Sequence, residues 1–100
     1  MDNFFDEVKK AAEKKVIYTE HALDEMNVEE ELISKDEIRQ VIFEGEIVED
    51  YPEDKRGHSC LMFAYTSVGR PVHVICSPKE EYCTVSDPFG PKRKFFCYDF

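Results

Sequence analysis

Residues 60–77, CLMFAYTSVGRPVHVICS, decide the fold of this chain. Two runs rich in β-branched and aromatic residues, 60–66 and 71–77, flank the short segment Ser67-Val68-Gly69-Arg70. A glycine between two such runs is typical of a tight β-hairpin. The sequence therefore predicts two antiparallel strands, Cys60–Thr66 and Pro71–Ser77, joined by a turn.

The register of this hairpin decides which of its side chains reach the core. If Val68-Gly69 is a two-residue loop, the facing pairs are Tyr65–Val72, Phe63–Val74 and Leu61–Cys76. That face is strongly apolar and is expected to pack on helices. The opposite face carries Met62, Ala64, His73 and Ile75. His73 then lies across from the small Ala64, which leaves room above the sheet, but a slip of one residue would reverse this assignment.

Helix signals precede the hairpin. Asn3, Thr19 and Ser34 are suitable N-caps, and Ser34 forms a capping box with Glu37, in which each side chain satisfies the other's backbone donor. Apolar residues follow each cap at helical spacing, and Gly45 ends the third helix. The sequence thus predicts two to three helices in the first 45 residues.

Short β-prone runs complete the pattern. The predicted strands are Val16–Tyr18, Ile47–Tyr51 and Tyr82–Ser86, whereas Pro88, Gly90 and Pro91 are expected to interrupt regular structure. Residues 94–100 are expected to form a last edge strand or an ordered tail. We therefore expect an α+β fold, with the helices on one face of an antiparallel sheet of three to five strands. One domain spans residues 1–100, mainly helical over 1–45 and mainly β over 46–100.

The charge is distributed unevenly. The 100 residues carry a net charge of -9, which by itself disfavours a nucleic-acid partner. Residues 1–54, however, hold 18 of the 22 acidic and 6 of the 13 basic residues, a net charge of -12, and residues 55–100 carry +3. A basic surface in the second half is therefore compatible with the acidic average.

The composition also bears on location and on metals. No apolar run is long enough to span a membrane, and no export signal is seen, so a cytoplasmic location is expected. The cysteines are expected to be reduced and partly buried thiols; they are Cys60, Cys76, Cys83 and Cys97. A metal site of His73, Cys76 and Cys83 is a weaker alternative, because the spacing matches no closed four-ligand pattern. No cofactor is expected.

Two histidines are candidates for chemistry. His21 falls in the first turn of the second helix, where a neutral imidazole beside an anion site could bind phosphate or move a proton. His73, on the open sheet face, could act as a general acid or base. The structural alternatives are a His21 that bonds a neighbouring strand and a His73 that is simply half-buried. His58 is expected to be a solvated loop residue.

Basic residues in the second half are candidates for holding phosphate. Arg70, Lys92 and Arg93 carry this prediction, and aromatic residues accompany the last two: Phe89, Phe95, Phe96 and Tyr98. Cations interleaved with aromatics suit contact with an RNA backbone and stacking on bases. Ordinary solubilising charge near a C-terminus is the alternative.

An ordered series of short motifs resembles a family. Tyr18-Thr19-Glu20-His21-Ala22-Leu23-Asp24-Glu25-Met26 is similar to the "xxHAxxRM" opening of the bacterial domain of unknown function 4258. The resemblance continues through residues 34–52, 57–61 and 70–74. Glu25 and Asn27 depart from it where relatives carry arginine, and residues 86–89 replace a usual Thr-Val-Tyr strand end. The resemblance implies a likeness to small toxins of the RelE and BrnT type, which cleave or bind RNA and are neutralised by antitoxins.

Three functions follow as hypotheses. The first is a toxin-like RNA-directed protein, such as a metal-independent endoribonuclease with His21 and His73 as acid and base. The second is a non-catalytic interaction module, either dimeric or bound to a partner protein such as an antitoxin. The third is a metal-binding regulator that uses the His73, Cys76 and Cys83 set.

Overall fold

Each helix begins at the cap that the sequence predicts. In the computed structural model, which describes residues 3–28 and 32–91, the Asn3 side chain accepts from the backbone N–H of Asp6, at 2.9 Å, and α1 spans Phe4–Lys14. Thr19 caps α2 (Glu20–Met26) in the same way. The predicted capping box of Ser34 and Glu37 is present at the start of α3 (Lys35–Glu44).

Gly45 follows α3 as predicted, but glycine is needed there for a reason other than a left-handed backbone conformation. Its φ is -85°, which any residue can adopt. A Cβ at this position would lie 2.5 Å from the carbonyl oxygens of both Val41 and Phe63. Glycine is required here because the backbone of a strand passes directly against the end of the helix.

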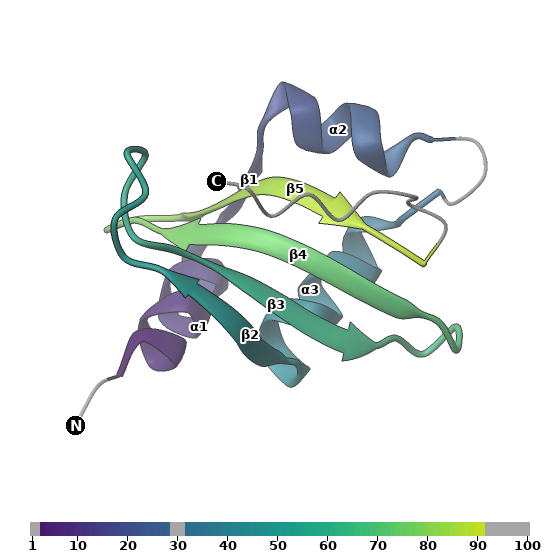
Figure 1. Ribbon diagram of the computed structural model, residues 1–100, viewed down its shortest axis with the longest axis horizontal. Helices are drawn as coiled ribbons and strands as arrows, with labels where there is room; N and C mark the ends of the chain where they lie inside the picture. Colours follow the sequence, from purple (N-terminus) through teal and green to yellow (C-terminus); the bar gives the residue numbers. More distant parts are fainter. Residues whose placement is uncertain (1–2, 29–31, 92–100) are drawn as a thin grey trace.

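Five strands form one sheet in the order β1-β5-β4-β3-β2 (Figure 1). The strands are β1 (Val16–Tyr18), β2 (Glu46–Tyr51), β3 (Ser59–Tyr65), β4 (Pro71–Pro78) and β5 (Cys83–Phe89). The α+β class is therefore confirmed. The sheet is mixed rather than wholly antiparallel, because β1 pairs with β5 in parallel. The pairing partner of a three-residue strand is a tertiary property that residue alternation does not encode.

β5 runs through Pro88, where we expected regular structure to stop. Pro88 pairs with Val74 of β4. β1 reaches only as far as Val85 along the other side of β5. Beyond that residue β5 is an edge, and a proline whose missing N–H would point outward is tolerated there.

The β3–β4 hairpin differs from the predicted register by one residue. The N–H of Gly69 donates to the carbonyl of Thr66, the N–H of Thr66 donates to the carbonyl of Arg70, and Gly69 has a φ of +85°. These features define a three-residue loop with a left-handed glycine, not the two-residue loop that we expected.

Because of this one-residue difference in register, the side chains of β3 lie on the opposite faces from those predicted. The side chains of β4 lie on the predicted faces. Val72, Val74 and Cys76 face the helices, as predicted, and His73 and Ile75 face away. In β3 the inward residues are Cys60, Met62 and Ala64. Their neighbours Leu61, Phe63 and Tyr65, which we expected inside, face outward, so that Phe63 rather than Ala64 lies across from His73.

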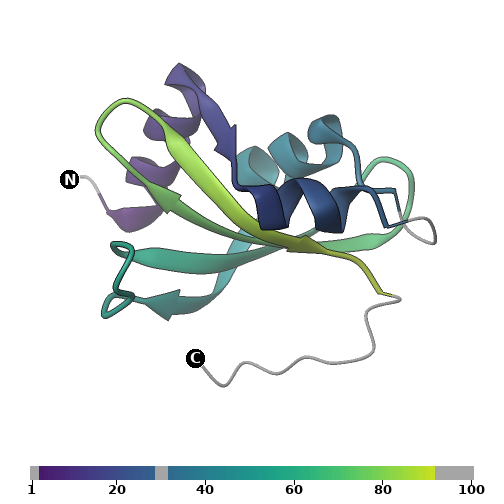
Figure 2. The ribbon, with the colours of Figure 1, turned by 90° about the horizontal axis from the view of Figure 1, so that it is seen from above.

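The helices α1 and α3 cover one face of the sheet, and α2 lies beside β5 and β1 (Figures 1 and 2). The main core lies between α1, α3 and the inward face; among its fully buried residues are Val8, Ile38, Val41, Ile42, Val72, Val74 and Val85. Among residues 3–28 and 32–91, no helix combines the length and the apolar character needed to cross a bilayer.

A buried ion pair joins α3 to the hairpin loop. Two guanidinium nitrogens of Arg70 donate to the two carboxylate oxygens of Glu37, at 3.0 and 2.7 Å, and Thr66 Oγ1 donates to the same carboxylate at 2.9 Å. The side chain of Glu37 is only 7% exposed, and that of Arg70 is 26% exposed. The bonds from Arg70 hold the pKa of Glu37 below its usual range.

Replacing Arg70 should therefore destabilise the fold. Arg70→Ala leaves a buried carboxylate without its main partner and is expected to lower the free energy of unfolding by about 2–4 kcal/mol, measured by urea denaturation at pH 7. Adding Glu37→Gln should restore part of this loss. The control is Lys14→Ala, which removes the exposed pair with Glu81 and should cost less than about 0.5 kcal/mol. Equal effects of the Arg70 and Lys14 variants would contradict a structural role for the buried pair.

Candidate functional site

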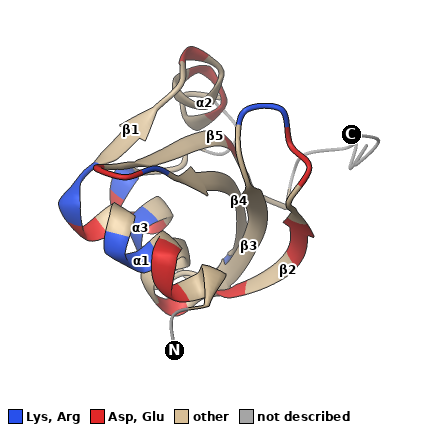
Figure 3. Cartoon of the chain, turned by 90° about the vertical axis from the view of Figure 1, so that its left-hand side faces the viewer, with Lys and Arg blue, Asp and Glu red and all other residues tan. Residues whose placement is uncertain are grey.

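The face of β3, β4 and β5 that is turned away from α1 and α3, called the open face below, carries a second apolar cluster. Leu61, Ile75 and Phe89 are almost fully buried there, and Tyr51 packs against them. Aromatic and aliphatic side chains thus cover the middle of this sheet face. No helix of the described chain packs on it (Figure 3).

His73 is part of this surface. Its ring stacks on Phe89 with the centroids 4.9 Å apart, and it contacts the ring of Phe63 at 4.8 Å. Burial among these rings lowers the pKa of His73 from its usual value of 6.5, because desolvation penalises the charged form. His73 is therefore a neutral imidazole at pH 7, able to accept a proton.

His21 reaches the edge of the open face from the first turn of α2. Its Nε2 lies 3.3 Å from Oδ1 of Asp87 on β5, and the side chains are 59% and 16% exposed respectively. The anion beside His21 is therefore a carboxylate of the chain itself. A carboxylate next to one ring nitrogen orients the imidazole and gives its charged form a partner.

Strand register places His73 diagonally across from Asp87, the residue that His21 contacts. Asp87 pairs with Ile75, and Phe89, two residues later in β5, pairs with His73, two residues earlier in β4. Diagonal neighbours of this kind are about 7–8 Å apart on one face of a sheet. His21 and His73 therefore flank the Asp87–Ile75 pair, one from the helix and one from the sheet.

The predicted phosphate-binding residues do not join them within the described chain. Arg70 lies on the helix side of the hairpin, bound to Glu37 and to the carbonyl of Leu32, whereas His73 faces the other way. Lys92 and Arg93 lie outside the described residues. The role of all three in binding phosphate stays a prediction.

The alternative metal set is divided between the two faces. Cys76 and Cys83 are buried on the helix side together with Cys60. Hydrogen bonding to Cys60 and Cys83 raises the pKa of Cys76. His73 lies on the open face. Within residues 3–28 and 32–91, no cluster of three His, Cys, Asp or Glu side chains is arranged to hold a metal ion.

A cavity of about 690 Å³, which the sequence did not indicate, is lined in part by Ile75. Its apolar walls are Tyr51, Pro52 and Ile75, and its rim is the loop between β2 and β3, residues 52–58. Ile75 connects the cavity to the histidine pair, since it is the strand partner of Asp87. Figure 3 shows both acidic and basic positions along this loop.

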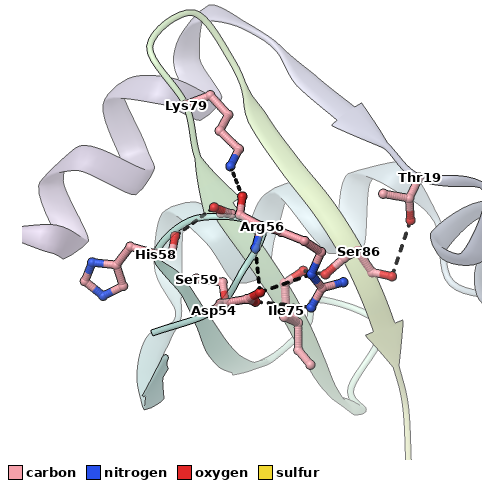
Figure 4. A network of polar contacts seen from close by, with 9 residues as sticks. Thr19, Asp54, Arg56, His58, Ser59, Ile75, Lys79 and Ser86 are labelled. Atoms are coloured by element: carbon pink, nitrogen blue, oxygen red, sulfur yellow. Dashed lines mark hydrogen bonds and ion pairs between the residues drawn. The ribbon is translucent and has the colours of Figure 1, made fainter. Parts of the chain in front are cut away.

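Asp54 organises the loop (Figure 4). Its carboxylate accepts from Nε, a terminal nitrogen and the backbone N–H of Arg56, and from Oγ of Ser59 at 2.6 Å. The bonds from Arg56 hold the pKa of Asp54 far below its usual value. The carbonyl of Arg56 also accepts from the ammonium group of Lys79. These hydrogen bonds link Arg56 to Asp54 and to Lys79 across the rim.

His58 lies in the loop with its side chain 37% exposed, as expected, but it has two partners that the sequence did not indicate. Its ring stacks on Phe4 with the centroids 3.6 Å apart, and its Nε2 contacts the carboxylate of Asp50. The pair fastens the start of α1 to the end of β2. The sequence did not indicate that Phe4, the first residue of α1, contacts His58, because the two residues are far apart along the chain.

The family model described as "Domain of unknown function (DUF4258)" matches residues 18–85. The chain belongs to this family. The DUF4258 match contains both His21 and His73, and it ends at Val85, two residues before Asp87. No curated protein and no solved structure matches the chain. The likeness to RelE and BrnT toxins stays a prediction.

The burial of His73 predicts a pH dependence of stability. Since its pKa is lower in the folded state, the unfolded state binds more protons around pH 6, and the free energy of unfolding falls as the pH is lowered through the usual value of 6.5. His73→Gln removes this contribution. Between pH 7.5 and 5.5 the variant should lose less stability than the wild type in urea titrations. Parallel pH profiles for the two proteins would contradict the assignment.

Proposed function

We propose that the open face binds RNA and cleaves it without a metal ion, as a toxin-like endoribonuclease. The observation that carries the proposal is the placement of His21 and His73 on either side of the Asp87–Ile75 pair. Two imidazoles across a shared surface are what acid–base cleavage of a phosphodiester requires. The family assignment adds no activity to this argument.

The two histidines take different roles in this mechanism. His73, kept neutral by burial, removes the proton from the ribose 2′-hydroxyl, whose oxygen attacks the adjacent phosphorus. His21, with Asp87 as counter-charge, donates a proton to the departing 5′-oxygen. The products are a 2′,3′-cyclic phosphate and a free 5′-hydroxyl, and the two histidines have exchanged protonation states.

The aromatic surroundings support a single-stranded ligand. Phe63 and Tyr51, which are both partly exposed, lie on or beside the open face, and unpaired bases stack on such rings. The exposed cations nearest the cavity are Lys55 and Arg56 on its rim. The phosphate path would run along this rim.

A partner protein such as an antitoxin is the second candidate function. Large apolar side chains are exposed at the hairpin end of the domain: Tyr65 at 70%, Val68 at 68% and Leu32 at 60%. Arg70 binds the carbonyl of Leu32, which places that residue beside the hairpin. This group lies away from the cavity and suits a protein–protein contact.

The proposal predicts the effect of removing each histidine. With a mixed-sequence RNA in the presence of EDTA, His21→Ala and His73→Ala should each reduce the cleavage rate about 100-fold or more. The cleaved ends should carry a cyclic phosphate. A DNA of the same sequence should remain intact, because it lacks the 2′-hydroxyl nucleophile.

His58→Ala is the matched control, because it removes the third histidine without touching the pair. It should cleave RNA within a few-fold of the wild-type rate once thermal melting has shown that the variant is folded. Wild-type protein without activity, or cleavage unchanged in both His21→Ala and His73→Ala, would overturn the proposal.

A further inference from the structure

We propose that the cavity beside the histidine pair binds a guanine base, so that the protein selects guanosine next to the phosphate on which it acts. The inference rests on the proposed function for its ligand class, RNA. It extends that function by assigning a base-recognition site to residues of the loop between β2 and β3.

The walls of the cavity suit a flat ring. Tyr51 and Pro52 lie at the end of β2, and Ile75 contributes from β4. All three present apolar surface, and Tyr51 is packed against the Leu61–Ile75–Phe89 cluster, which holds it in place. A base inserted between such surfaces gains stacking and loses water from both faces.

Some polar groups on the rim are already paired within the protein, and others are not. Asp50 is engaged by His58, and Asp54 is engaged by Arg56 and Ser59. Glu53 and Lys55, which flank Asp54, make no hydrogen bond or ion pair with other described residues, although both line the cavity. The rim therefore offers one carboxylate and one ammonium group to a ligand.

This pair of charges matches guanine among the four RNA bases. Guanine presents two adjacent donors, N1–H and the N2 amino group, next to the acceptor O6, with N7 as a further acceptor. The two oxygens of Glu53 can accept from both donors, and Lys55 can donate to O6 and N7. Adenine, cytosine and uracil each lack the adjacent pair of donors on this edge.

The pre-ordered loop makes such recognition selective. Asp54 fixes the backbone of Arg56, and Lys79 holds the carbonyl of the same residue. Glu53 and Lys55 are therefore presented from a loop that internal hydrogen bonds hold together. Less conformational entropy is lost on binding, and a base that leaves Glu53 unsatisfied is rejected.

Nucleotide binding tests this site independently of cleavage. The protein is titrated with GMP, AMP, CMP and UMP, and binding is followed by backbone amide chemical shifts. GMP should bind about 10-fold or more tightly than AMP. Glu53→Gln should remove most of this difference by weakening GMP alone. Glu13→Gln, which removes a carboxylate from the exposed side of α1, should bind GMP like the wild type.

The double variant His21→Ala/His73→Ala separates this inference from the proposed function. It should retain the preference for GMP, since neither histidine lines the cavity. A preference for GMP without RNA cleavage would overturn the ribonuclease and keep the guanine site. Equal affinities for the four nucleotides, no binding at millimolar concentration, or an unchanged preference in Glu53→Gln would each overturn the guanine site.

Discussion

The three-residue turn of the β3–β4 hairpin is the constraint on which the rest of the molecule depends. Gly69 adopts a left-handed conformation that few other residues tolerate, and Thr66 pairs with Arg70 across the loop. This pairing sets the side of the sheet on which each residue of β3 lies. Met62 therefore joins the core, and Phe63 contacts His73 on the open face.

The same turn places Arg70 where it can bind Glu37 on the helix side. The positive charge of Arg70 is therefore paired with Glu37 and joins α3 to the sheet. The open face carries histidines and aromatic residues instead. The division between the two faces is consequently chemical as well as geometrical. Thiols and aliphatic side chains fill the helix side, while groups that can move protons or stack on bases gather on the other.

Much of the local structure could be predicted from the sequence because its causes are local. The caps at Asn3, Thr19 and Ser34, and the alternation in β4, depend on neighbouring residues, and all were confirmed. The side chains of β3 were assigned to the wrong face because two-residue and three-residue loops differ by one hydrogen bond that composition does not reveal. The parallel pairing of β1 with β5 depends on the packing of the whole chain.

The candidate site was predictable only in part. His21 and His73 attracted notice as individual residues, but their common neighbour Asp87 lies beyond the family match, which ends at Val85. The cavity was not foreseen, because Tyr51, Glu53 and Ile75 come from separate strands and a loop. Arg70 shows why charge alone is a weak guide to phosphate binding. It lies in the basic half of the sequence, but in the fold it is paired with Glu37.

The central claim is that His21 and His73 belong to one functional face. Its most direct test is an NMR titration of the imidazole ring signals with a 2′-O-methyl oligoribonucleotide, which binds like RNA but lacks the nucleophile for cleavage. The account predicts that the signals of both histidines shift together with one dissociation constant. A shift at only one of the two histidines, or at neither, would contradict it.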